Sequence, residues 1–286
     1  MNEAILTMLK QYNCKSVDDY VSALREILQS LALLGLWRTK FFEHAAVYGG
    51  SALRILYGLD RFSEDLDFSL LKPTPGFAIS NYFDGLQAEI ESFGFRVQLE
   101  HKKRSRTIES AFLKTNTLEQ LISIQVDSSI TKNIPRGKIL KIRLEIDIDP
   151  PGNFKTESKY LLQPVPFSIK TYVLPDLFAG KMHALLCRQW KTRVKGRDWF
   201  DLVWYISNHP QLHLVHLEQR MKQTGHLASD EFLTITLFFD RLVNTIETVD
   251  LEKAKRDIAP FIRDPASLQL WSKAFFKDIV SKIQIV

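Results

Sequence analysis

The sequence contains little cysteine and no long uncharged apolar run. Its 286 residues include two cysteines, Cys14 and Cys187, which form no CxxC pair. Neither a disulfide scaffold nor a cysteine-based metal framework is therefore expected. No stretch reaches the roughly 18 apolar residues that a membrane helix requires. Residues 1–15 carry Glu3 and no apolar core after a basic start, so we expect no signal peptide and a cytoplasmic protein with no membrane partner.

The sequence also lacks internal repeats, low-complexity tracts and a large excess of one charge. Lysine and arginine total 38 and aspartate and glutamate total 33, which leaves a net charge of +5. The hydrophobic fraction of 45% and the charged fraction of 25% exclude a disordered, collagen-like or rod-like protein. A mild basic excess is compatible with a polyanionic partner but does not require one.

Hydrophobic periodicity predicts an α+β N-terminal half and a helical C-terminal half. A capped helix is expected to begin after Ser16 and to end near Gly35. Strand candidates are residues 65–71, 95–100, 108–114, 121–127, 139–148 and 169–173. From Asp176 onward the pattern is helical. We therefore divide the chain into an N-terminal domain, 1–170, and a C-terminal helical domain, 171–286.

A glycine-rich turn and a pair of aspartates form the central chemical pattern. Gly49, Gly50 and Ser51 precede a helix, and their N–H groups would suit a phosphate. Asp65 and Asp67 are two residues apart on a strand and thus share one face. Neighbouring carboxylates repel one another unless a cation lies between them, and Mg²⁺ is the natural oxygen-liganded cation.

A third carboxylate is expected from the strand at 139–148. Apolar residues alternate there with charged ones, and Glu145 and Asp147 lie on the charged face. Either could complete a site for two Mg²⁺ ions, which would stabilise the attacking and leaving oxygens of a phosphoryl or nucleotidyl transfer. Taken singly, a DxD pair, a GGS turn or an acidic sheet face is usually ordinary surface or turn structure. Their order along one chain makes the combination more specific.

Four segments together resemble the nucleotidyltransferase AbiEii/AbiGii toxin family. They are Tyr48-Gly-Gly-Ser-Ala-Leu-Arg54, Arg61-Phe-Ser-Glu-Asp-Leu-Asp-Phe68, Lys141-Ile-Arg-Leu-Glu-Ile-Asp-Ile-Asp-Pro-Pro-Gly152, and Leu177-Phe-Ala-Gly-Lys-Met-His-Ala-Leu-Leu-Cys-Arg188 with Arg197-Asp-Trp-Phe-Asp-Leu202. The resemblance spans about residues 45–205. It implies a DNA polymerase β-like nucleotidyltransferase core with a mixed or antiparallel sheet, followed by a helical region, and a toxin that has a cognate antitoxin.

The resemblance also implies roles for individual residues. The glycines and Ser51 would hold the triphosphate of an NTP, Asp65 and Asp67 would bind Mg²⁺, and Glu145 would be the third carboxylate, with Asp147 as its rival. Lys181 would contact the triphosphate and neutralise the leaving pyrophosphate. Asp198 would orient Lys181 or help to activate the attacking group, and Asp201 would mainly brace its helix.

Basic residues gather in two stretches. Lys181 and Arg188 are seven residues apart on a helix, so they lie on nearly the same face and could both contact the nucleotide. Weaker candidates for RNA contacts are Lys102, Lys103 and Arg104 in an expected hairpin, and Arg193 and Lys195 after the lysine helix. Solvated charged loops are the alternative reading for both stretches. His183 is two positions from Lys181 on its helix and is expected to pack or lie on the surface, and Cys187 is expected to lie in the core. The other histidines, such as His209, His213 and His216, show no zinc pattern.

These observations lead to one leading hypothesis and two alternatives. The leading hypothesis is a Mg²⁺-dependent nucleotidyltransferase toxin that transfers a nucleoside monophosphate from an NTP to an acceptor. By family resemblance, that acceptor is the 3′ end of tRNA, and the modification would block translation. One alternative is a nucleotidyltransferase that modifies a small molecule or a protein. The other is an inert relative that binds nucleic acid or a partner protein.

Overall fold

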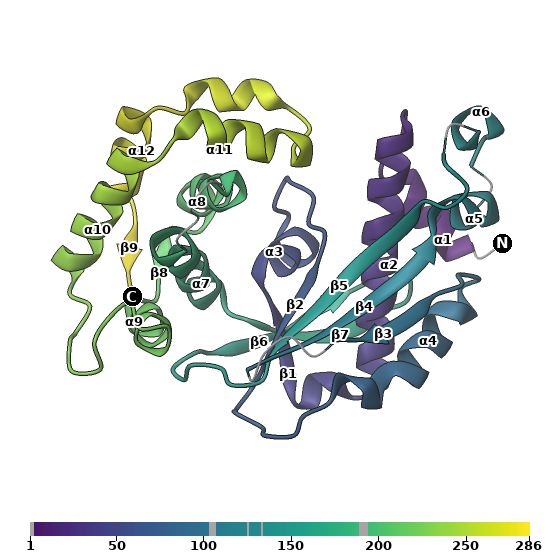
Figure 1. The fold of residues 1–286 in the computed structure, drawn as a ribbon, viewed down its shortest axis with the longest axis horizontal. Coiled ribbons are helices and arrows are strands. Elements are labelled where there is room, and N and C mark those ends of the chain that lie inside the picture. The colour runs from purple at the N-terminus through teal and green to yellow at the C-terminus, as the bar shows by residue number, and fades with distance from the viewer. Residues whose placement is uncertain (1–2, 103–106, 125, 133, 189–193) are drawn as a thin grey trace. The chain divides into compact units, whose positions relative to one another are not determined.

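The computed structural model describes residues 3–102, 107–124, 126–132, 134–188 and 194–286 (Figure 1). The chain forms two compact units, and each is assembled from separated segments. The first unit consists of residues 1–57, 62–150 and 157–171, and the second of residues 58–61, 151–156 and 172–286. The polypeptide therefore passes from one unit to the other several times.

A mixed sheet is the framework of the first unit. Its seven strands among the described residues follow the order β3-β4-β5-β2-β1-β7-β6. They are β1 (Ala45–Tyr48), β2 (Leu66–Leu70), β3 (Gln98–His101), β4 (Ile108–Asn116), β5 (Ile139–Asp147), β6 (Thr156–Leu161) and β7 (Phe167–Tyr172). β2 pairs parallel with β5 and antiparallel with β1, and β3 and β4 form the expected antiparallel pair. The α+β class predicted from the sequence is confirmed.

Helices of the first unit share its apolar core with the strands. They are α1 (Glu3–Lys10), α2 (Val17–Arg38), α3 (Gly49–Tyr57), α4 (Phe83–Ser92), α5 (Thr117–Ser123) and α6 (Ser128–Thr131), with short 3₁₀ turns at Phe41–Glu43 and Ile79–Tyr82. The α2 helix begins at the predicted capping box, where the Ser16 hydroxyl accepts from Asp19 N–H and the Asp19 carboxylate accepts from Ser16 N–H. Figure 1 shows α2 crossing beside the sheet and α4 beside α2.

Gly35 does not end α2, which continues to Arg38. A Cβ at Gly35 would lie 3.0 Å from backbone and side-chain atoms of Leu86 in α4. The glycine therefore allows the two helices to approach closely, and the expected helix end at this position was wrong. Gly35 was misread as a helix end because glycine is common both just beyond helix ends and at tight contacts between helices.

The predicted strand at 121–127 was also wrong: α5 covers residues 121–123, and the other described residues of the segment, 124, 126 and 127, belong to no strand. The Asn116 side chain accepts a hydrogen bond from Glu119 N–H and caps this helix. Leu121 is buried, whereas Ile122 is 57% exposed. A short apolar run fits either a strand or a helix, and the cap decides the outcome here.

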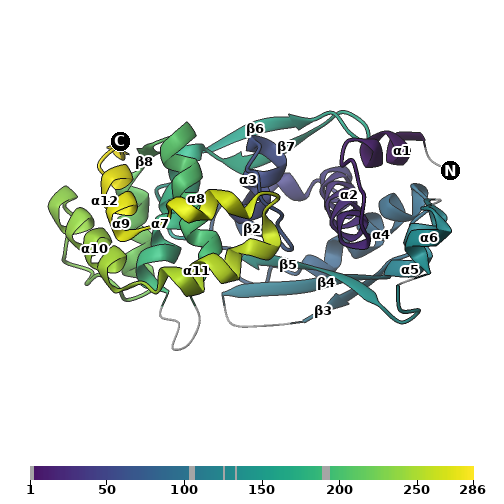
Figure 2. The ribbon, with the colours of Figure 1, turned by 90° about the horizontal axis from the view of Figure 1, so that it is seen from above.

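The second unit is mainly helical. Its helices are α7 (Leu174–Cys187), α8 (Gly196–Asn208), α9 (Leu214–Gln223), α10 (Ile235–Thr248), α11 (Leu251–Ile258) and α12 (Lys273–Val280), with 3₁₀ turns at Ala259–Phe261 and Pro265–Leu270. Strands β8 (Gln211–Leu212) and β9 (Gln284–Ile285) form a short parallel pair that the helical pattern did not indicate. Within this unit α7 packs against both α8 and α9, as Figures 1 and 2 show.

Candidate active site

Two acidic residues of the first unit, Asp67 and Glu145, lie side by side in a row of paired residues that crosses four strands and is called the acidic row below. The pairing of β2 with β5 places Asp67 beside Glu145, and the flanking strands add Tyr48 opposite Asp67 and Ser110 opposite Glu145. Directly paired residues in a sheet point to the same face, so the Asp67 and Glu145 side chains are neighbours. The structure thus brings together two carboxylates that are 78 positions apart in the sequence.

Gly49 lies directly against Asp67. Its φ of +76° is in the left-handed region, and a Cβ there would lie 2.5 Å from Asp67 Oδ2. A larger residue would therefore push the carboxylate out of position. Gly49 and Gly50 form the first turn of α3, where backbone N–H groups have no partner within the helix. The glycine turn and a carboxylate are thereby packed against each other.

Hydrogen bonds to its backbone hold Asp65 in position. Its carbonyl oxygen accepts hydrogen bonds from the Ser51 hydroxyl and from Gln29 Nε2 of α2, the latter at 3.5 Å. Gln29 also donates to the Ser63 carbonyl at 3.1 Å, and the Ser51 and Ser63 hydroxyls are 2.9 Å apart. Both Ser51 and Gln29 are fully buried. The Ser51 hydroxyl thus supports the segment that leads to the aspartates.

Arg143 bridges two of the predicted metal ligands. Its guanidinium lies 2.8 Å from Asp65 Oδ2 and 3.2 Å from Glu145 Oε1. Hydrogen bonding to Asp65 raises the pKa of Arg143, and the charges of Asp65, Asp67 and Glu64 add to this effect. The carboxylates therefore attract a cation at this position, and a metal bound by Asp65 and Glu145 would replace the guanidinium between them.

Asp147 occupies a different position from Glu145. It pairs with Ser69 of β2, and its Oδ1 accepts a hydrogen bond from the N–H of Asp149 at 3.1 Å. The side chain is buried, with 8% of the residue exposed. Both Asp147 and Glu145 remain candidates, but the strand pairing places Glu145 beside Asp67.

In the second unit, Lys181 belongs to a buried ion-pair cluster. Its Nζ lies 2.7 Å from Asp201 Oδ2, and Arg61 donates two hydrogen bonds of 2.6 Å to the same carboxylate. Burial opposes ionisation of Asp201, but Arg61 and Lys181 outweigh it and hold its pKa below the usual range. This cluster joins two of the quoted segments, and it matches the bracing role expected for Asp201.

The remaining predicted residues of this unit line a pocket. Arg188, Lys195 and Asp198 lie around a cavity of about 370 Å³. Arg188 Nη1 is 3.4 Å from Asp198 Oδ2, and burial lowers the pKa of Lys195 to about 8, assisted by the nearby charge of Arg188. Asp198 therefore contacts Arg188, whereas the contact with Lys181 is made by Asp201. Of the weaker RNA candidates, Lys102 follows β3, and Lys103, Arg104 and Arg193 lie outside the described residues.

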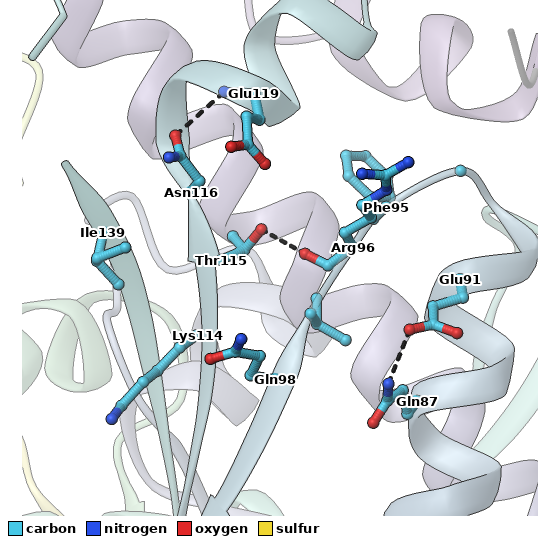
Figure 3. A pocket seen from close by; sticks show the side chains of 12 residues that line it. Gln87, Glu91, Phe95, Arg96, Gln98, Lys114, Thr115, Asn116, Glu119 and Ile139 are labelled. Atoms are coloured by element: carbon cyan, nitrogen blue, oxygen red, sulfur yellow. Dashed lines mark hydrogen bonds between the residues drawn. The ribbon is translucent and has the colours of Figure 1, made fainter. Parts of the chain in front are cut away.

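A larger pocket of the first unit contains none of the predicted site residues. It has a volume of about 980 Å³ and is lined by parts of α4, β3, β4 and α5 (Figure 3). Several of its polar groups bond one another: Gln87 to Glu91, Thr115 to the Arg96 carbonyl, and Glu119 to Asn116. Lys114 on its rim is four residues along β4 from Ser110. The pocket is therefore separate from the acidic row.

Three supporting residues were missed by sequence reasoning. Gln29 and Ser63 gave no signal, because a buried glutamine in an apolar helix and a serine in a loop are common. Arg143 did carry a recognisable signal, since it lies two residues before Glu145 on the same face of a strand. An arginine on the face that carries the acidic residues could have been recognised as their counterion.

Across the parts of the chain that the structure describes, no helix combines the length and apolar character needed to cross a bilayer.

Comparisons with known proteins identify a family and solved structures that are similar to this chain. The family model described as "Nucleotidyl transferase AbiEii toxin, Type IV TA system" matches residues 31–276. No curated protein matches the chain. Among solved structures, MenT4, a nucleotidyltransferase toxin from Mycobacterium tuberculosis H37Rv, has 14% identity and a TM-score of 0.60, and the match covers 99% of this chain and 89% of that one. A putative nucleotidyltransferase from Helicobacter pylori has 19% identity and a TM-score of 0.49 over 92% of this chain and 96% of that one.

The family match covers most of the sequence and includes every segment on which the resemblance rested. The MenT4 likeness shows a shared fold. This chain belongs to the AbiEii family of nucleotidyl transferase toxins of type IV toxin–antitoxin systems, and it is a nucleotidyltransferase.

Proposed function

We propose that the protein transfers a nucleoside monophosphate from an NTP to the 3′ end of tRNA in a Mg²⁺-dependent reaction and releases pyrophosphate. The observation that carries this proposal is the row in which Asp67 lies beside Glu145 and against Gly49. Such an arrangement places a phosphate-binding turn next to paired carboxylates. A binding module has no use for carboxylates that repel one another.

The predicted metal ligands of the first unit fit a magnesium ion. Asp65, Asp67 and Glu145, with Asp147 as the rival of Glu145, offer only carboxylate oxygens, which are the ligands that Mg²⁺ prefers. When bound, the metal would supply positive charge to the oxygens of the reacting phosphate. Arg143 already occupies a cation position between Asp65 and Glu145, which supports this assignment.

The first turn of α3 supports binding of the triphosphate. We assign that role to the backbone N–H groups of Gly49 and Gly50 at the positive end of the helix. Ser51 keeps its hydroxyl on the Asp65 carbonyl, and so it contributes its backbone to the nucleotide and its side chain to the position of the aspartate. We expect Gly49→Ala to impair both functions.

Residues of the second unit supply countercharge in this proposal. Lys181 and Arg188 would neutralise the triphosphate and the leaving pyrophosphate, as the family resemblance implies. Asp201 and Asp198 hold these two cations in the structure. Asp198 would therefore act on the nucleotide through Arg188. We also propose that the chain is divided into an N-terminal domain, 1–170, and a C-terminal helical domain, 171–286.

Basic residues would hold the RNA acceptor. Lys102, Lys103, Arg104, Arg193 and Lys195 are the proposed contacts to phosphates, which would be independent of base sequence. Transfer to tRNA should therefore decline as salt concentration rises. NTP and tRNA are both cytoplasmic, so the protein is proposed to act there, and its family implies an antitoxin partner.

The proposal is tested by incubating the protein with each labelled NTP, Mg²⁺ and total tRNA. Label should appear on tRNA with the wild type and with the surface control Asp18→Asn, and it should disappear with Asp67→Asn or with EDTA. Label on protein or on a small molecule, with none on RNA, would contradict the tRNA acceptor and favour a nucleotidyltransferase that modifies a protein or a small molecule. Growth arrest that persists in Asp67→Asn would favour the inert binding protein.

A further inference from the structure

We propose a second metal site, for Zn²⁺ or a similar transition metal, formed by His183, Cys187 and His226 in the second unit. Each residue offers one ligand atom, and the three atoms lie within 4.8 Å of one another. In the portion of the chain that the structure describes, no other group of three or more His, Cys, Asp or Glu residues places its ligand atoms together in this way. Nitrogen and sulfur ligands suit Zn²⁺, whereas the carboxylate row suits Mg²⁺. The inference is independent of the proposed reaction.

The sequence brings the three ligands together through one helix and one turn. His183 and Cys187 are four residues apart in α7, so they lie on one face of that helix. His226 follows α9, where Gly225 adopts a φ of +72° and His226 N–H bonds the Met221 carbonyl at 2.8 Å. This left-handed turn ends α9 and reverses the chain. It places the imidazole of His226 6.0 Å from that of His183, between ring centres.

One hydroxyl fixes the protonation of both imidazoles. Thr224 Oγ1 lies 2.9 Å from the Arg220 carbonyl, to which it donates. It can then accept from His183 Nε2 at 2.8 Å and from His226 Nδ1 at 2.9 Å. Each ring therefore carries its proton on the nitrogen that faces Thr224 and keeps a lone pair on the other. A hydrogen bond on one imidazole nitrogen is typical of metal-binding histidines.

The surroundings of the three ligands carry positive charge. The charges of Arg220 and Arg188 both act on His183. Cys187 is buried, and its thiol would lose a proton to solvent as the metal–sulfur bond forms. The resulting negative charge would offset the repulsion between the metal and the nearby arginines.

A metal can enter from solvent and would leave one position open. Thr224 and Gly225 are exposed beside the partly buried His226. Three protein ligands leave the fourth tetrahedral position for water or another ligand. The bound metal would connect α7 to the turn after α9. We therefore expect weaker binding than at four-ligand structural sites, together with a stabilised second unit.

The test uses Co²⁺ as a spectroscopic probe of the untagged, full-length protein. A cobalt–thiolate bond gives an intense near-ultraviolet band that the carboxylate row cannot produce. The band should appear with wild type and with the matched controls Cys14→Ser and His44→Gln, and Zn²⁺ should abolish it by displacing Co²⁺. It should be lost in Cys187→Ser and in His226→Gln. Thr224→Val should weaken Zn²⁺ binding about 10-fold, because the rings lose their common hydrogen-bond partner.

A second readout guards against variants that do not fold. Zn²⁺ should raise the melting temperature of wild type and Cys14→Ser, but not that of folded Cys187→Ser or His226→Gln. His226 is partly exposed, so its replacement by glutamine should leave the fold intact. The absence of a band in wild type, or a band that survives in both ligand variants, would overturn the site.

Discussion

At the scale of single residues, a measurement of activity can decide whether Glu145 or Asp147 is the third metal ligand. Glu145 lies beside Asp67, whereas Asp147 lies beside Ser69 and accepts a hydrogen bond from Asp149 N–H. We expect Glu145→Gln to lower the rate of nucleotide transfer roughly 100-fold or more, and Asp147→Asn to lower it much less. Steady-state kcat at saturating Mg²⁺ measures both. The reverse order of effects would make Asp147 the third ligand.

Arg143 provides a separate test at the same scale. Arg143→Gln leaves Asp65 and Glu145 without the guanidinium that bridges them. We expect this variant to melt at a lower temperature than wild type without Mg²⁺, and to gain more stability from added Mg²⁺. Thermal melts with and without MgCl₂ measure the difference, and Arg25→Gln, whose guanidinium contacts the Lys141 carbonyl, is the control. An equal Mg²⁺ response in both variants would contradict metal binding between these carboxylates.

At the scale of elements, local patterns predicted more than long-range pairings. The alternation in β5 and the Ser16 cap of α2 were read correctly, because both depend on residues close in sequence. The placement of Glu145 beside Asp67 depends on the parallel pairing of β2 with β5, which no local pattern specifies. The site formed by His183 and His226 was missed for the same reason, since its ligands come from α7 and from the turn after α9.

His216 in α9 makes the stability of the second unit dependent on pH. It is fully buried and packs edge-on against the stacked rings of Phe154 and Tyr172, and its Nδ1 bonds the Gly152 carbonyl. Burial is the main cause that lowers its pKa to about 3, and Arg220 and His213 are the charged or titratable groups that add to this effect. The folded protein therefore keeps the ring neutral. The unfolded chain begins to bind a proton near pH 6.5, so stability is complete above that pH and declines below it.

The expected loss at pH 5 is about 2 kcal/mol, since 1.5 pKa units separate that pH from the unfolded value. Urea unfolding of the full chain at pH 7 and pH 5 measures it. His216→Phe should remove this part of the pH dependence, whereas the exposed His44→Gln should retain it. An unchanged pH dependence in His216→Phe would show that the ring does not resist protonation.

At the scale of the whole molecule, the second unit depends on a short segment from early in the chain. Residues 58–61 belong to it, and Arg61 bonds the buried carboxylate of Asp201. Asp201→Asn leaves Arg61 and Lys181 without their counterion, and we expect a loss of about 3–5 kcal/mol in the free energy of unfolding. Asp198→Asn, whose partner Arg188 is more exposed, should cost less than about 1 kcal/mol.

The same segment affects how the protein can be divided. A fragment of residues 171–286 lacks Arg61 and the 151–156 segment that contacts His216 through Gly152. We expect it to show weak near-ultraviolet circular dichroism and no cooperative melting, unlike the full chain. A cooperative transition in that fragment would show that these segments are dispensable.

The close approach of Gly49 to Asp67 has a genetic consequence. If cells are forced to express the toxin, survivors must carry mutations that inactivate it. Gly58 shares the φ of +76°, but a Cβ there meets nothing within 4 Å, whereas one at Gly49 meets a carboxylate oxygen. Even an alanine codon at position 49 should therefore rescue growth, while many codons at position 58 should not. Because Gly49 lacks a Cβ, substitutions at this one codon should be frequent among cells that survive expression of the toxin.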